Sequence, residues 1–342
     1  MTGKRKPETK PVKLALQGGG AIGAFTWGVL DYFLEDGRVR FEAVSGASAG
    51  AMNAVVLADG LARDGADGAR RQLEQFWLGV SRQDMLTSGA REVLAAFYKT
   101  WRMPGFSPYG ALKQFASLAS PYNFNPFNVN PLINLVEDLV DFEAVRKLES
   151  MKVHVSATNV ETGKVRVFSG DELDAATVMA SACLPFLFQA VKKDGEAYWD
   201  GGYAGNPSLW PFFEEPGSDI MLIQLDPMIE QALPGSPEEI LDRIRSMTFN
   251  NPLLHDLRAM LLIHKLADAY GLDRARYPRS RVHRIDASAT LDAAQTSRTL
   301  DVSRSFFEDL RDAGRAAAQD WLGRHFDDLG VRDTVDIEAE FT

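Results

Sequence analysis

The sequence predicts an α/β fold, a three-layer α/β/α sandwich around a mostly parallel central sheet. Two observations lead to this prediction. Strand-like apolar segments alternate with helical segments along the 342 residues, which is typical of parallel sheets covered by helices. Glycine-rich turns at residues 18–23 and 46–50 follow the first two predicted strands. Since parallel strands end at the same edge of a sheet, we expect both turns to lie at that edge.

The elements follow from periodicity and breaking residues. The first strand is expected at 12–16 and the second at 41–44. The helix between them, expected over 24–34, has apolar residues at helical spacing, and Gly37 is suited to cap its end. Further strands are expected at 153–157, 165–168, 190–193, 219–225 and 282–285, and long helices at 237–248, 253–270 and 301–326.

Composition excludes several classes of protein. The net charge of −10 argues against nucleic-acid binding and gives no general attraction to anionic lipid. The single cysteine, Cys183, rules out an intramolecular disulfide, and neither zinc nor calcium ligand spacing is present. Residues 1–13 lack the apolar core of a secretory signal, and the longest apolar run, 259–263, is too short to span a bilayer. We therefore expect a cytoplasmic protein without metal or cofactor.

The first turn reads Gly18-Gly19-Gly20-Ala21-Ile22-Gly23. Its backbone amides can converge on one negatively charged atom. The same glycines also fit a dinucleotide-binding pattern, which needs an acidic residue at the end of the second strand. Here that strand ends in Val44-Ser45-Gly46, and Glu42 stands at its start. An anion-binding turn is therefore favoured, although glycines that only ease helix–sheet packing remain an alternative.

The second turn, Gly46-Ala47-Ser48-Ala49-Gly50, places a serine between small residues where a strand passes into a helix. A serine on such a tight turn presents its hydroxyl beyond the sheet and is typical of a nucleophile. Together the two turns offer a nucleophile and a binding place for an oxyanion, which indicates acyl transfer.

A serine nucleophile also needs a base. Trp199-Asp200-Gly201-Gly202 closes a predicted strand, and its glycines permit a turn that directs the Asp200 carboxylate outward. Alone, this motif is most often a simple turn. An ordinary triad would instead use a histidine after Asp200, and the candidates are His255, His264, His283 and His325.

Five motifs in order resemble the patatin-like phospholipase family. They are the first glycine turn, the Ser48 turn, residues 156–163, residues 180–185, and Asp200-Gly201-Gly202 with Asn206-Pro207. The resemblance covers roughly residues 12–226 and implies a catalytic domain there. Residues 227–342 are expected to form a helical extension packed on the same domain.

The resemblance implies hydrolysis of lipid acyl esters by a Ser–Asp dyad without histidine. Ser48 would be the nucleophile, Asp200 the proton acceptor, and Gly18, Gly19 and Gly20 the oxyanion hole, with Gly23, Gly46, Gly50, Gly201 and Gly202 supporting the motifs. Many family members carry a basic residue where this chain has Ile22, so a positive charge near the oxyanion is missing. A non-enzymatic lipid-binding protein is the other alternative.

Two segments stand apart from the predicted core. Residues 1–11 are polar and expected to be disordered. Residues 97–131 are rich in aromatic residues and proline, which indicates a folded cap rather than regular structure. This cap either simply covers the core or binds acyl chains and makes transient contact with a membrane surface.

Overall fold

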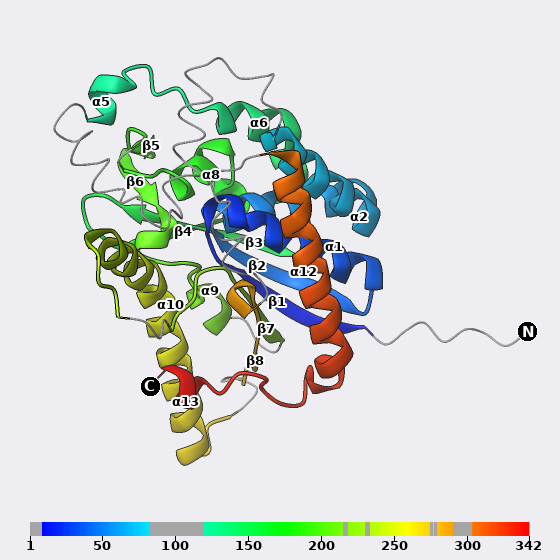
Figure 1. The fold of residues 1–342 in the computed structure, drawn as a ribbon. Coiled ribbons are helices and arrows are strands. Elements are labelled where there is room, and N and C mark those ends of the chain that lie inside the picture. Colours follow the sequence, from blue (N-terminus) through cyan, green and yellow to red (C-terminus); the bar gives the residue numbers. More distant parts are fainter. Residues whose placement is uncertain are drawn as a thin grey trace, which may run out of the picture.

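The computed structural model describes residues 9–81, 120–185, 187–214, 218–229, 233–273, 276, 279–289 and 303–341. Within these residues an eight-stranded sheet lies between helices (Figure 1). Its order is β5-β6-β3-β2-β1-β7-β8, with β4 beside β3. The strands are β1 (Lys10–Leu16), β2 (Val39–Ala47), β3 (Lys152–Asn159), β4 (Val165–Ser169), β5 (Val191–Lys193), β6 (Glu196–Asp200), β7 (Asp219–Gln224) and β8 (Val282–Asp286).

The centre of the sheet is parallel. Strand β1 pairs in parallel with β2 and β7, β2 with β3, and β7 with β8. Strands β4 and β6 pair antiparallel with β3, and β5 pairs antiparallel with β6. The register sets Leu16 beside Gly46, so the two glycine turns leave the sheet at one edge, as predicted.

Helices cover both faces of this sheet. They are α1 (Gly23–Asp36), α2 (Ala49–Ser81), α5 (Pro121–Phe124), α6 (Pro131–Leu139), α7 (Phe142–Arg146), α8 (Ala175–Ser181), α9 (Trp210–Phe213), α10 (Pro237–Ala269), α12 (Arg304–His325) and α13 (Ile337–Phe341). Successive strand residues face opposite sides. Leu14 and Leu16 join the core beneath α1, α2 and α12, whereas Ala15 joins a second core beneath α9, α10 and α13. The α/β/α prediction is therefore confirmed.

The C-terminal part of the chain belongs to the same packed body. Strand β8 extends the central sheet, and α12 packs along α1 (Figure 1). A Cβ on Gly28 of α1 would lie 2.0 Å from the Arg311 carbonyl oxygen, and one on Gly314 of α12 would lie 2.1 Å from that of Phe25. The two helices therefore meet at their backbones, and larger residues at these two glycines would force them apart.

Two boundaries differ from the sequence prediction. Strand β1 starts at Lys10, so the arm expected over residues 1–11 is too long by two residues. Helix α10 continues through Pro252, where two helices were expected. Phe249 before the proline and Leu253 after it are both buried, so packing on each side holds the halves in line.

The aromatic cap segment is only partly described. Of the expected cap over residues 97–131, residues 97–119 lie outside the described residues. In the described remainder, the Phe127 side chain is 89% exposed. None of the helices described here has the length and apolar character needed to cross a membrane.

Candidate active site

Ser48 occupies the tight turn between β2 and α2. Its φ of 53° lies in the left-handed region, which is strained for a residue with a side chain. The flanking glycines make this turn possible. A Cβ on Gly46 would lie 2.5 Å from the Gly50 carbonyl carbon, and one on Gly50 would lie 2.1 Å from the Leu16 carbonyl oxygen. The sequence-predicted elbow is thus present, locked by backbone contacts.

Backbone hydrogen bonds fix the direction of this serine. The Ser48 N–H donates to Ser181 Oγ at 2.9 Å, and the Ser48 carbonyl accepts from the Met52 N–H at 3.1 Å. The Ser48 side chain is completely buried, and its Oγ has no hydrogen bond of good geometry to any described residue. A buried hydroxyl without a partner is uncommon, and here it leaves Ser48 Oγ available to a ligand.

Asp200 ends β6 and is equally well anchored. Its N–H donates to the Cys183 carbonyl at 2.8 Å, and its carbonyl accepts from Thr158 Oγ1 at 2.8 Å. The side-chain Oδ1 accepts from the Gly202 N–H at 2.7 Å. The second carboxylate oxygen, Oδ2, has no hydrogen-bond partner of good geometry among the described residues.

Burial raises the pKa of Asp200 to about 7, because the charged carboxylate has lost its water. The Gly202 amide and the Ser48 hydroxyl partly offset this rise in the pKa. Ser48 and Asp200 are therefore neighbours, although neither Ser48 Oγ nor Asp200 Oδ2 meets the geometry of a formed hydrogen bond. A carboxyl with this pKa can accept and return a proton near neutral pH.

The first glycine turn lies directly against the nucleophile. A Cβ on Gly18 would lie 2.9 Å from Ser48 Cβ, so only a glycine fits. The Gly18 N–H donates to Asn206 Oδ1 at 2.7 Å, which leaves that amide engaged. No described residue accepts a hydrogen bond from the Gly19 or Gly20 amides. Gly20, with a φ of 58°, opens a short 3₁₀ turn that leads into α1.

The remaining motif glycines permit close packing around these groups. A Cβ on Gly23 would lie 2.7 Å from Ala49 Cβ, and one on Gly201 would lie 2.1 Å from the Ser156 carbonyl oxygen. At Gly202 the added atom would meet the Phe249 ring at 2.1 Å. All ten residues selected from the sequence therefore gather at one edge of the sheet.

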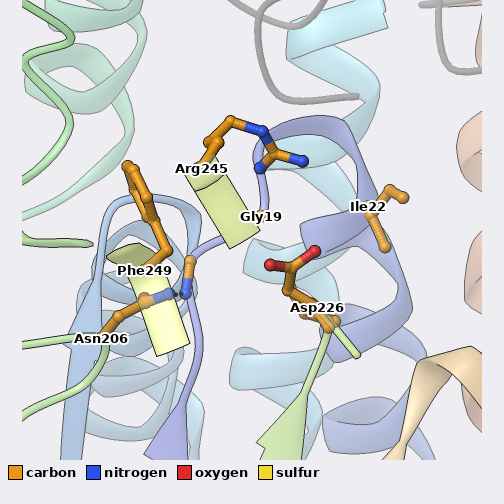
Figure 2. Close-up of a pocket in the computed structure, with 8 residues that line it drawn as sticks. Gly19, Ile22, Asn206, Asp226, Arg245 and Phe249 are labelled. Atoms are coloured by element: carbon orange, nitrogen blue, oxygen red, sulfur yellow. Dashed lines mark hydrogen bonds between the residues drawn. The ribbon is translucent and has the colours of Figure 1, made fainter. Parts of the chain in front are cut away.

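Helix α10 closes this edge. Its Phe249 packs on Tyr203 with ring centroids 4.8 Å apart, directly beyond Gly202. A cavity of about 10 Å³ remains, with room for one water molecule, and is lined by Gly18, Gly19, Ile22, Asn206, Leu225, Asp226, Arg245 and Phe249. Figure 2 shows the Arg245 side chain over the Gly19 turn and the Phe249 side chain to one side of it. Ser48 itself is completely buried.

All five histidines lie in the described part of the chain, and no hydrogen bond there joins any of them to Ser48 or Asp200. His283 pairs with Asp219 at 3.0 Å, at the opposite edge of the sheet, and His325 pairs with Asp328 at 2.8 Å. His255 is exposed on α10. In the same described residues, no group of three or more His, Cys, Asp or Glu side chains is arranged to hold a metal ion.

The model of the family described as patatin-like phospholipase matches residues 14–213. This span is more than half of the 342 residues. The chain belongs to the patatin-like phospholipase family. That membership identifies it as a lipid hydrolase and agrees with the resemblance found in the sequence.

No curated protein matched this family member in sequence. Among solved structures, it is similar to VipD from Legionella pneumophila, with 16% identity and a TM-score of 0.44 over 95% of this chain and 72% of VipD. It is also similar to ExoU in the heterodimeric ExoU–SpcU complex from the type III secretion system of Pseudomonas aeruginosa, with 13% identity and a TM-score of 0.32. That match covers 92% of this chain and 53% of the ExoU chain.

The patatin-like match contains the three motifs but ends before α10. The sequence motifs include Asn206 without giving it a role, and they do not include Arg245, Asp226 or Phe249. These residues carry no local motif, and each reaches the site through the fold. A single signal is present for Asn206, its place four residues after Gly202.

Proposed function

We propose that this protein hydrolyses carboxylic ester bonds of phospholipids with Ser48 as nucleophile and Asp200 as general base. One observation carries the proposal. Ser48 Oγ and Asp200 Oδ2 are buried neighbours, and each lacks another hydrogen-bond partner among the described residues. The lipid class of the substrate comes from family membership.

In the first half-reaction, Ser48 Oγ attacks the ester carbonyl carbon while its proton passes to Asp200 Oδ2. The carbonyl oxygen becomes an oxyanion, which the Gly19 and Gly20 amides bind. Gly18 supports this turn through its bond to Asn206 and is not itself a donor to the oxyanion. The C–O bond of the alcohol then breaks, and the leaving oxygen takes the proton from Asp200. An acyl group remains on Ser48.

The second half-reaction regenerates the enzyme. Asp200 removes a proton from water, the hydroxide adds to the acyl carbon, and the same amides bind the second oxyanion. Collapse releases the fatty acid and returns the proton to Ser48. The reaction needs neither a metal ion nor a cofactor in this scheme.

Access is the remaining requirement. Since Ser48 is fully buried, some part of the surrounding structure must move before a lipid can reach it. We propose that α10 is this part, because it packs on the turn that follows Asp200. We expect transient contact with a lipid surface, aided by exposed side chains such as Tyr122, Phe127 and Val129. Flotation with phosphatidylcholine vesicles would measure this contact.

The assignment of the nucleophile is tested with a fluorophosphonate, which reacts with activated serines. Mass spectrometry should locate the adduct on Ser48. Ser48→Ala should lower kcat for ester hydrolysis by on the order of 10⁴-fold, with a melting temperature within a few degrees of that of the natural protein. Ser45→Ala, a buried serine on β2, is the matched control and should keep its activity. Labelling of another serine would refute the proposal. A lipid-binding protein without activity would show no labelling at all.

A further inference from the structure

A cation faces the candidate oxyanion turn from a distant part of the chain. Arg245 of α10 lines the same small cavity as Gly18, Gly19 and Asn206, and Figure 2 shows its guanidinium over the Gly19 turn. Its Nε is buried and has no hydrogen-bond partner among the described residues. A buried guanidinium N–H without an acceptor is unfavourable unless a ligand supplies one.

The positive charge acts at the site itself. Burial raises the pKa of the Tyr203 phenol, and the charge of Arg245 opposes that rise, which places the guanidinium near the turn that follows Asp200. Of the described residues that line the cavity, Arg245 is the one cation and Asp226 the one anion. Without Arg245 this wall would carry a net negative charge and would repel an anionic group.

We propose that Arg245 binds the phosphate of the substrate and thereby makes the enzyme selective for phospholipids over neutral glycerides. This inference rests on the proposed function. In a glycerophospholipid the phosphate and the scissile ester share one glycerol unit, so a cation beside the oxyanion turn is suitably placed for the phosphate. A planar guanidinium offers paired N–H donors that match phosphate oxygens.

The cavity of about 10 Å³ is too small for a phosphate group and marks only the floor of such a site. In the proposed opening, α10 moves away from the turn that follows Asp200, and Arg245 moves with that helix. The proposal requires the guanidinium to remain within reach of the rim of the opened site, on the wall to which Ile22 brings no charge.

The test compares two substrates with the same acyl chains, dioleoyl phosphatidylcholine and diolein, in the same mixed micelles. For Arg245→Gln we expect kcat/KM on the phospholipid to fall about tenfold or more, with diolein hydrolysis within about twofold of the unmodified enzyme. Arg245→Lys keeps the charge but loses the paired donors. Its kcat/KM on the phospholipid should lie between those of Arg245→Gln and the unmodified enzyme. Arg324→Gln, an exposed arginine on α12, is the control and should leave both rates unchanged.

The ratio of the two rates does not depend on how much of a variant is folded, so a partly unfolded Arg245→Gln still decides the question. An equal fall on both substrates would overturn the phosphate role, as would an unchanged ratio. If the unmodified enzyme hydrolysed neither lipid, the proposed function would fail instead.

Discussion

The two walls of the candidate active site are built in different ways. The platform, formed by the turns after β1, β2 and β6, is joined by backbone contacts that exclude any Cβ at Gly18, Gly50 and Gly201. The cover helix, α10, touches this platform through side chains such as Phe249 and Arg245. The platform is therefore fixed in shape, whereas the cover can change position or sequence at smaller cost.

The outer surface of the cover helix strengthens this contrast. Ile240, Ile244 and Met247 lie within two turns of α10, and their side chains are between 44% and 53% exposed. The same helix lies outside the family match, whereas every motif residue of the platform lies inside it. We infer that the platform supplies the reaction and the cover controls access and substrate choice.

The largest expected effect comes from Asp200→Asn. Asparagine keeps the shape of the side chain but cannot take the Ser48 proton, so kcat should fall on the order of a thousandfold or more. A steady-state assay with a neutral short-chain ester measures this loss. A variant that retained a tenth of the activity would show that Asp200 is not the base.

The same variant should gain stability at high pH. Burial raises the pKa of Asp200 from 3.8 to about 7, so the fold stabilises its protonated form. This contribution is fully present below pH 4 and is lost as the pH rises through 7. The free energy of unfolding of Asp200→Asn relative to the natural protein should therefore increase by on the order of 4 kcal/mol between pH 4 and pH 8. Urea unfolding at the two pH values provides the comparison.

The platform was predictable because its constraints are local. A serine between Gly46 and Gly50 specifies an elbow from the short-range geometry of the chain. The partner of the Gly18 amide was not predictable, since Asn206 lies 188 residues away. The sequence pattern therefore predicts Gly18 among the oxyanion donors, whereas its N–H is engaged by Asn206.

The cover helix was not predictable as a cover. Its sequence predicts two helices interrupted near Pro252, and only packing on both sides of the proline produces one. Nothing near Arg245 or Phe249 in the sequence indicates contact with a turn more than 200 residues earlier. Such contacts depend on the whole fold.

The next effect concerns the pH dependence of the reaction. Only the ionised Asp200 can accept a proton, and its pKa is held at about 7 by burial. We expect kcat/KM on a neutral ester to rise about tenfold per pH unit below 7 and to level off above it. A rate profile from pH 5 to pH 9 checks this. A midpoint near pH 4 would mean that Asp200 is hydrated during the reaction.

A smaller effect is expected from the cover. Phe249→Ala removes the ring that covers Gly202 and Tyr203, and loss of this buried ring should destabilise the protein by about 3 kcal/mol. Hydrolysis of a soluble short-chain ester should stay the same or rise a few-fold, because the approach to Ser48 is wider. Phe33→Ala, a buried change on α1, controls for stability alone. A fall in ester hydrolysis as large as that of Asp200→Asn would mean that α10 takes part in catalysis.

The smallest effect is expected from the histidines, and it separates a dyad from a triad. His283 is engaged by Asp219 at the opposite edge of the sheet, and His325 is engaged by Asp328. Replacing each of His154, His255, His264, His283 and His325 with Gln should leave kcat within about tenfold of the natural value. Fluorophosphonate titration counts the active sites in each preparation, so a folding defect is corrected for. A histidine variant that folds normally and yet is as inactive as Ser48→Ala would mean that the rigid platform needs a third catalytic group, and the Ser–Asp dyad would be wrong.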